Sequence, residues 1–153
     1  MESSQNSNQN CPFCSIVTGK IPTRKIYEDE HLLVTLDINP AGPGHMLLLP
    51  KKHYASLQEV PLSLMMYLAA VCKQMSWAAL RGLQMEGSLF VLSQGEAAGQ
   101  TVPHLFFHLI PRKENDGLSP ITLPHQPFSP QDINDMRVMV IRGLKQVVEG
   151  GDV

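Results

Sequence analysis

The sequence predicts an α+β protein with an antiparallel sheet, and three observations support this class. Short apolar runs bounded by proline, glycine and charged turns indicate strands within residues 21–51 and again within 88–112. A long stretch between these two regions has apolar residues at helical spacing. The resulting order of strands, helix, strands and helix differs from the strict strand–helix alternation that produces a parallel sheet.

In the N-terminal third of the chain, the sequence predicts a tail, a short helical turn and three strands. Residues 1–10, MESSQNSNQN, are polar and aperiodic, which predicts a disordered tail. CPFCSIVTGK then predicts a helical turn that ends at Gly19. Two strands are expected around a charged turn, with Tyr27 closing the first and LLVTLD forming the second. PAGPG breaks the chain before a third strand, HMLLLPK.

A long central helix is expected to start at Pro61 or Ser63 and to end at Gly82, because these residue types favour helix ends. Its apolar positions advance by one, three or four residues and therefore share one face. These positions are Leu64, Tyr67, Leu68, Val71, Met75, Ala78 and Ala79.

The rest of the chain predicts two more strands and a second helix. SLFVLSQ and TVPHLFFHLIPR are expected to be strands, and LSPITLPHQPFSP is proline-rich and expected to be irregular. The last helix should have Ser129 as N-cap, Pro130 in its first turn and Gly150 at its end. The expected organisation is a tail at 1–10, a domain at 11–112, and a proline-rich segment with a C-terminal helix at 113–153.

Length and composition argue against several functions. The net charge of −2 gives no electrostatic basis for binding nucleic acid or an anionic membrane. No apolar run reaches the roughly 18 residues that span a bilayer, and the N-terminus lacks a basic and then apolar export signal. Three cysteines do not make a disulfide framework. We therefore expect a cytoplasmic protein with reduced or metal-bound thiols.

Two of the cysteines form a CxxC motif with two possible roles. Cys11 and Cys14 have the spacing that recurs in structural zinc sites, and His53 and His104 are candidates for the other two ligands. The alternative is a pair of thiols that bind no metal. CPFC also resembles the active site of glutaredoxins, but a redox CxxC follows a buried strand. Here the preceding ten residues are polar, and the TVP segment that glutaredoxins share begins 87 positions after Cys14.

PHLFFHLIPR, residues 103–112, places His104, Phe106 and His108 at alternate positions of a predicted strand, where side chains share one face. With DINPAGPGHMLLLPKKH and GEAAGQTVPH, this stretch resembles the histidine triad (HIT) family of nucleotide-binding proteins. The resemblance runs from Cys11 to about Arg112, and the family's three alternating histidines are matched except at position 106. It implies an antiparallel sheet with a long helix, and a homodimer with a continuous sheet.

The resemblance also implies ligands and site residues. In zinc-bearing members of the family the structural metal is held at the positions of Cys11, Cys14, His53 and His104. Asp37 matches the carboxylate that accepts hydrogen bonds from both ribose hydroxyls. Gln100 and His108 match the phosphate end, where Ser93 stands in place of the family's asparagine. The apolar clasp on a purine base is implied at Phe13, Ile16, Ile21 and Ile38, with an ordinary core role equally open for Ile16.

Phe106 is the main departure from the family pattern. In the family, the middle histidine attacks the α-phosphate and forms a nucleotidyl-histidine intermediate, which requires a nitrogen lone pair. A phenyl ring has none. We therefore expect a purine nucleotide-binding protein with little or no such activity. The alternative is a nucleotide hydrolase or transferase in which His108 supplies altered chemistry. The remaining histidines are expected to be structural (His45) or solvent-facing (His31 and His125).

Overall fold

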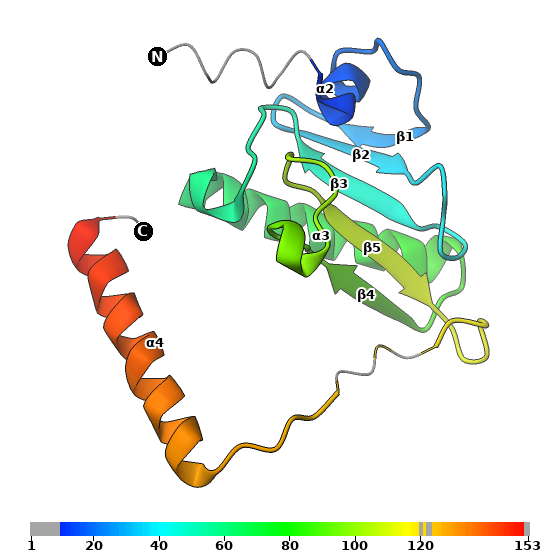
Figure 1. The fold of residues 1–153 in the computed structure, drawn as a ribbon. Helices are drawn as coiled ribbons and strands as arrows, with labels where there is room; N and C mark the ends of the chain where they lie inside the picture. The colour runs from blue at the N-terminus through cyan, green and yellow to red at the C-terminus, as the bar shows by residue number, and fades with distance from the viewer. Residues whose placement is uncertain (1–9, 120, 122–123, 152–153) are drawn as a thin grey trace. The chain divides into compact units, whose positions relative to one another are not determined.

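The computed structural model describes residues 10–119, 121 and 124–151. The predicted tail at 1–10 therefore lies almost wholly outside the described residues. The chain divides into two compact units, with the boundary after Leu118. The first unit holds the sheet, the helices α2 and α3 and two short 3₁₀ turns, and the second holds the C-terminal helix (Figure 1).

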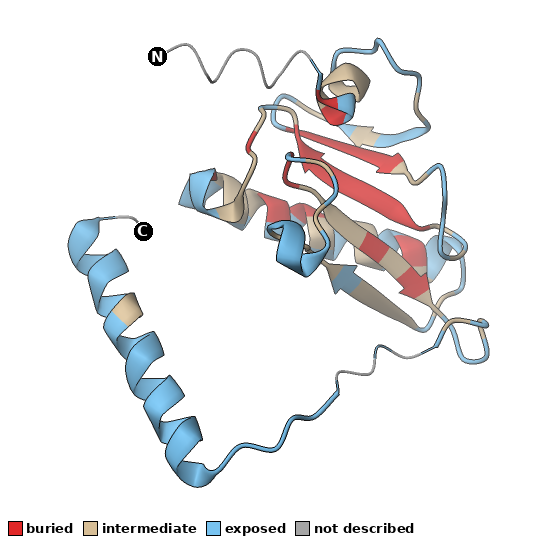
Figure 2. Ribbon diagram, viewed as in Figure 1, coloured by how far each residue is buried: buried red, intermediate tan, exposed pale blue. Residues whose placement is uncertain are grey.

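Five antiparallel strands form one sheet in the order β1-β2-β3-β5-β4, which confirms the α+β class and the antiparallel sheet. β2 and β3 lie inside the sheet, and all residues of β3 are buried (Figure 2). The strands are β1 (Lys25–Glu28), β2 (Leu32–Leu36), β3 (Met46–Pro50), β4 (Gly87–Val91) and β5 (Phe107–Arg112).

The long helix α3 (Leu62–Gly82) packs on one face of this sheet. Pro61 is its N-cap, as the sequence predicts. The predicted apolar face is confirmed except at Ala78, which is exposed, whereas Cys72 contributes to the packing instead. The buried residues on this side are Leu32, Val34, Met46, Leu48, Leu68, Val71, Ala79 and Leu109.

The other face of the sheet carries the short helix α2 (Pro12–Val17). Because side chains alternate along a strand, Leu47 and Leu49 of β3 point away from α3 and pack with Cys11 and Phe13. Phe106 also packs against this cluster. Every residue implied by the family resemblance for the metal site thus comes from α2 or from the loops that border this face.

β5 begins at Phe107, so the prediction that His104 and Phe106 lie within a strand is wrong. The preceding segment turns instead of pairing. The His104 N–H donates to the Val102 carbonyl at 2.8 Å, and the Leu105 N–H donates to the Tyr54 carbonyl at 2.6 Å. Pro103 has no N–H for a ladder hydrogen bond. His104 is thereby directed toward a different part of the molecule from His108.

The C-terminal helix α4 (Pro130–Gly150) is confirmed at both ends. Ser129 and Asp132 form a reciprocal capping box, and Gly151 adopts a left-handed conformation with φ +74° after the last turn. Two single 3₁₀ turns complete the described structure, at Leu57–Glu59 and Glu96–Ala98. In the described part of the chain no helix has the length and apolar character needed to cross a membrane.

Candidate functional site

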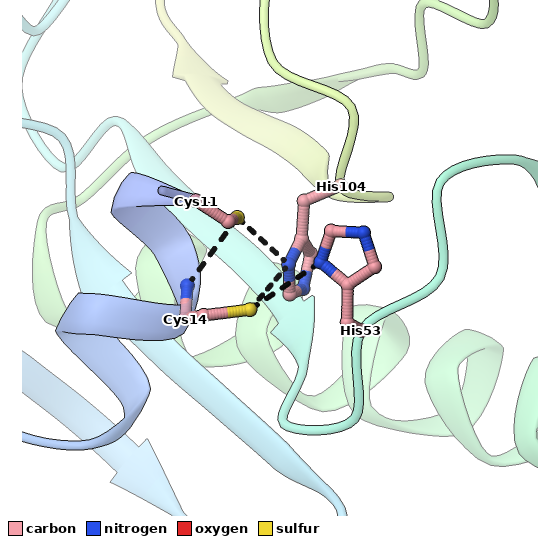
Figure 3. A group of neighbouring side chains, drawn as sticks. All are labelled: Cys11, Cys14, His53 and His104. Atoms are coloured by element: carbon pink, nitrogen blue, oxygen red, sulfur yellow. Dashed lines mark hydrogen bonds between the residues drawn. The ribbon is translucent and has the colours of Figure 1, made fainter. Parts of the chain in front are cut away.

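Four side chains from three separate segments meet at the end of α2. Cys11 caps this helix and Cys14 lies within it, His53 follows β3, and His104 precedes β5. Figure 3 shows both imidazole rings turned toward the two sulfur atoms. One potential ligand atom from each residue lies within 4.8 Å of all the others. The sequence-predicted set Cys11, Cys14, His53 and His104 is therefore assembled in space; we refer to it as the thiol cluster.

The distances in the thiol cluster suit a tetrahedral metal ion. Zinc bonds of about 2.0–2.3 Å at tetrahedral angles place ligand atoms roughly 3.3–3.8 Å apart. The Cys14 sulfur lies 3.3 Å from His53 Nδ1 and 3.7 Å from His104 Nδ1. The Cys11 sulfur lies 3.5 Å from His104 Nδ1. These three separations all fall in that range.

The far side of the His104 ring explains why its Nδ1 faces the sulfurs. His104 is fully buried, and its Nε2 lies 3.0 Å from the Pro50 carbonyl oxygen. A carbonyl only accepts, so Nε2 carries the proton and donates it, and Nδ1 keeps a free lone pair. Metal-binding histidines usually make such an outer hydrogen bond. Burial lowers the pKa of His104, which further favours the neutral ring that a metal requires.

The surroundings of the Cys14 thiol favour its protonated form. Burial, together with the neighbouring Cys11, raises the pKa of Cys14 to about 11. Without a positive partner the Cys14 sulfur therefore stays protonated near neutral pH. A bound dication reverses this preference because it stabilises the thiolate directly. Two thiols and two neutral imidazoles are a donor set that zinc prefers, so the residues present fit this metal.

A second group of titratable side chains, Asp37, His45 and His108, lies on the same side of the sheet. We refer to His45 and His108 as the histidine pair, and Asp37 is its carboxylate. Asp37 follows β2 and His45 precedes β3, and the Asp37 N–H donates to the His45 carbonyl at 3.0 Å. His108 pairs with Leu47 across β3 and β5. His45 is two residues from Leu47, so it is the diagonal neighbour of His108.

The geometry of this pair differs from that of the thiol cluster. His45 Nε2 lies 2.9 Å from His108 Nδ1, and the Asp37 carboxylate lies 3.5 Å from the first ring and 3.9 Å from the second. The Ala41 N–H donates to His45 Nδ1 at 3.0 Å. Nδ1 must therefore be the unprotonated nitrogen of His45, and Nε2 carries the proton. An Nε2–H cannot bind a metal, so this group does not fit an ion in the observed arrangement.

His45 makes polar contacts that the sequence alone did not predict. The sequence favours a structural role for His45, and only 5% of this residue's surface is exposed. Its contacts with His108 and Asp37 nevertheless make it part of the polar site. The register between β3 and β5 brings it there, and the GH dipeptide that precedes MLLLP carries no local signal of that pairing.

Phe106 lies between Phe13 and the histidine pair. Its ring centroid is 4.6 Å from that of Phe13 and 4.9 Å from that of His108. It fills this space with an apolar ring and offers no donor or acceptor. Phe13 in turn contacts the edge of the His104 ring at 5.7 Å. A continuous row of rings therefore joins the thiol cluster to the histidine pair.

Other residues implied by the family resemblance divide into exposed and occupied side chains. Ile38 and Ile21 are 75% and 42% exposed, whereas Ile16 is half-buried against Phe13 and its neighbours. Ser93 follows β4 and is half-buried. The Gln100 side chain is fully used within the protein. Its Oε1 accepts from the Gly95 N–H at 2.7 Å, and its Nε2 donates to the Ala55 and Val102 carbonyls at 2.9 and 3.0 Å.

Comparison with known families and sequences gives a consistent result. A family model described as the HIT domain matches residues 18–115. The chain is 45% identical over 108 residues to an uncharacterised HIT-like protein of Methanocaldococcus jannaschii, covering 70% of this chain and 82% of that protein. It is 39% identical over 118 residues to an adenylylsulfatase of Arabidopsis thaliana, covering 77% of this chain but only 59% of the plant protein.

Solved structures of similar proteins share the fold. A HIT family protein of Bacillus subtilis superposes with a TM-score of 0.79 at 32% identity, covering 87% of this chain and 96% of that one. A histidine triad nucleotide-binding protein of Candida albicans gives a TM-score of 0.77 at 28% identity, with 90% and 99% covered. A zinc-bound histidine triad family protein of Mycobacterium smegmatis gives 0.70 at 37% identity, with 82% and 88% covered.

Proposed function

The chain belongs to the HIT family, and we propose that it binds a purine nucleotide with little or no nucleotidyl-histidine hydrolase activity. The observation that carries this proposal is Phe106. Its ring occupies the space between Phe13 and His108, where the family resemblance places the nucleophile. A phenyl ring cannot form a bond to phosphorus, and replacing a nucleophile in a covalent mechanism typically costs about 10⁶ in turnover.

The binding part of the proposal rests on groups that remain available. Ile38 and Ile21 expose apolar surface next to Asp37 and α2, which suits the faces of a purine base. The Asp37 carboxylate accepts hydrogen bonds from two ribose hydroxyls, and His108 contacts a phosphate. Ser93 donates one hydrogen bond at the same end. Gln100 is proposed to shape the loop around Gly95 rather than to reach the ligand, because its amide is already engaged.

The alternative function is a HIT-type hydrolase or transferase with altered chemistry, acting on a phosphoramidate, a dinucleoside polyphosphate or a nucleotidyl ester. One observation favours it: His108 and Asp37 remain together, with 29% of the His108 side chain exposed. A half-exposed imidazole beside a carboxylate is a common general base. The relative from Arabidopsis thaliana is named as an adenylylsulfatase, so catalysis occurs among similar proteins.

Calorimetry with AMP, GMP and 2′-deoxy-AMP tests binding. We expect micromolar dissociation constants for the ribonucleotides and weaker binding of the deoxy form, which offers Asp37 only one hydroxyl. The absence of heat at millimolar AMP and GMP overturns the proposal. Acid quench after mixing with a labelled adenosine phosphoramidate separates the two functions. The binding function predicts no labelled protein and no hydrolysis, whereas steady turnover supports the altered enzyme.

We further propose that the thiol cluster holds one structural zinc ion. The three ligand separations, the orientation of His104 and the zinc-bound relative from Mycobacterium smegmatis support this assignment. Such an ion ties Cys11 and Cys14 at the start of the chain to His53 and His104 in the body of the domain. Thiols that bind zinc must remain reduced, which favours a reducing compartment such as the cytoplasm.

A homodimer is proposed from the surface around β4. Among the described residues β4 pairs with β5 alone, so its other edge is open, and Phe90 on it is 43% exposed. An apolar groove of about 490 Å³ runs between β4 and α3, with Trp77 and Cys72 in its wall. A long apolar edge of this kind needs a partner, and a second β4 continues the sheet.

The test of the dimer is sedimentation of Trp77→Glu. We expect a monomer, because a buried unpaired charge opposes association across the groove. Ile26→Glu on β1, the opposite edge of the sheet, is the matched control and should remain dimeric. A dimer that survives the first change and is lost with the second places the interface at β1 and contradicts the proposal.

A further inference from the structure

We propose that His45 is a positioning residue that fixes His108 in one tautomer, with the proton on Nε2. In this form His108 donates a hydrogen bond to an anionic ligand and has no lone pair there to attack phosphorus. The inference rests on the proposed function only for the identity of the ligand, a nucleotide phosphate. The tautomer itself follows from three contacts in the protein.

The first contact determines where the His45 proton lies. The Ala41 N–H points at His45 Nδ1 from 3.0 Å, and a backbone N–H can only donate. A proton on Nδ1 would set two donors against each other at that distance. His45 is therefore neutral, with its single proton on Nε2. Burial, which lowers the pKa of His45, agrees with the neutral state.

The second contact passes this constraint to His108. His45 Nε2 lies 2.9 Å from His108 Nδ1, a hydrogen-bond distance that requires one donor and one acceptor. Because His45 Nε2 carries a proton and donates the hydrogen bond, His108 Nδ1 must be the acceptor and carries no proton. Burial also lowers the pKa of His108, so the ring is neutral, and its one proton resides on Nε2. The Asp37 carboxylate lies 3.5 Å from His45 Nε2, and its negative charge favours a proton on that nitrogen.

The third contact explains why the Ala41 amide is held in place. Residues 40–44 lie in the connection between β2 and β3, and the His45 N–H donates to the Gly42 carbonyl at 3.1 Å. Gly44 has φ +74°, and a Cβ added there would lie 2.2 Å from Leu83 Cδ1. The left-handed backbone favours glycine here, and any other side chain would also have to displace the end of Leu83. The PAGPG segment thus holds the Ala41 amide in place, and this amide determines the tautomer of His45 and, through it, that of His108.

The chemical consequence concerns the missing nucleophile. A neutral imidazole attacks or accepts a proton through its unprotonated nitrogen. In His108 that nitrogen is Nδ1, which faces His45 and not a ligand. The nitrogen available to a phosphate is a donor, like the groups that stabilise oxyanions. His108 is therefore a binding group, and it does not replace the histidine that Phe106 displaces.

Long-range ¹H–¹⁵N spectra of the histidine rings test the tautomer in the ligand-free protein at pH 7.5. We expect the His108 Nδ1 signal at the unprotonated position and the Nε2 signal at the protonated one. His45→Gln should keep this pattern, because the Gln amide nitrogen still donates toward His108. His45→Leu removes the donor and should give a mixture of tautomers. His31→Gln, on an exposed ring, is the control and should change nothing.

Several outcomes overturn the proposal. The first is a His108 ring that is protonated on Nδ1, or on both nitrogens, in the parent protein. The second is a folded His45→Leu variant whose His108 signals are the same as those of the parent protein. If His45→Leu does not fold, the parent and His45→Gln spectra decide the matter alone. AMP binding is measured on the same samples, with a loss of roughly three- to tenfold expected in His45→Leu and largely restored in His45→Gln. A parent protein that has the expected tautomer but binds no nucleotide contradicts the proposed function and not the tautomer.

Discussion

The thiol cluster and the histidine pair each contain two histidines on the same side of one sheet, yet their proton arrangements are opposite. In the thiol cluster a backbone carbonyl, that of Pro50, accepts from the outer nitrogen of His104. In the histidine pair a backbone amide, that of Ala41, donates to the outer nitrogen of His45. The first ring therefore offers a lone pair to its neighbours, and the second offers a proton.

This difference shows that the backbone behind a histidine decides its chemistry. A lone pair aimed at two sulfurs suits a metal ion. A proton aimed at a second imidazole suits a chain of hydrogen bonds that ends in a donor. Phe106 separates the two groups and belongs chemically to neither.

Loss of one metal ligand should produce the largest change. Cys14→Ser should lower the free energy of unfolding by roughly 4 kcal/mol, the linkage expected when a metal is present at about a thousandfold over its Kd. Urea denaturation with and without a chelator provides the measurement. Chelator should lower the free energy of unfolding of the parent protein to that of the variant. Cys72→Ser, outside the thiol cluster, is the control and should keep its response to chelator.

Restoring the nucleophile should have the next largest effect. Phe106→His should raise hydrolysis of an adenosine phosphoramidate by about a hundredfold, a figure reduced from the ~10⁶ cost of losing a nucleophile because Ser93 holds the phosphate less well than asparagine. Adding Ser93→Asn should raise the rate more than additively. Phe128→His, at an exposed position, controls for an added histidine. A parent protein that already turns over at the revertant's rate contradicts the assignment of Phe106.

Removing the carboxylate should weaken nucleotide binding by about tenfold, or about 1.4 kcal/mol. Asp37→Ala loses charge-assisted hydrogen bonds to the ribose, and it also removes a group that lies 3.5 Å from His45. Calorimetry with AMP and 2′-deoxy-AMP provides the readout. The variant should bind both equally, since the discrimination comes from the hydroxyl. Asp135→Ala on α4 should keep the parent's preference, and an unchanged preference in Asp37→Ala contradicts the role of that residue.

The dependence of stability on pH should show the smallest effect. Burial lowers the pKa of His45 and of His108, so the unfolded state binds protons that the folded state does not. Their contribution is complete above the ordinary histidine pKa of about 6.5 and is lost as pH falls below it. His45→Gln should reduce the slope of unfolding free energy between pH 6.5 and 5.5 by about 1 kcal/mol per pH unit. His31→Gln should leave that slope unchanged.

The sequence predicted the sheet, both long helices and the thiol cluster, for identifiable reasons. Pro61, Ser129 and Gly150 mark helix ends by local chemistry, and the spacing of Cys11 and Cys14 is itself a local signal. The start of β5 was missed because a contact with Tyr54, distant along the chain, draws Leu105 out of the ladder. The contacts of His45 were not predicted, because they depend on strand register and on an amide four residues away.

Zinc analysis of three proteins tests the central contrast most directly. The parent protein, Cys14→Ser and His108→Gln are purified without chelator, and zinc is measured per chain. We expect one zinc in the parent, none or nearly none in Cys14→Ser, and one in His108→Gln. This expectation is contradicted by a parent without zinc, or by a zinc ion that survives Cys14→Ser and is lost with His108→Gln, because the metal would then lie at the histidine pair.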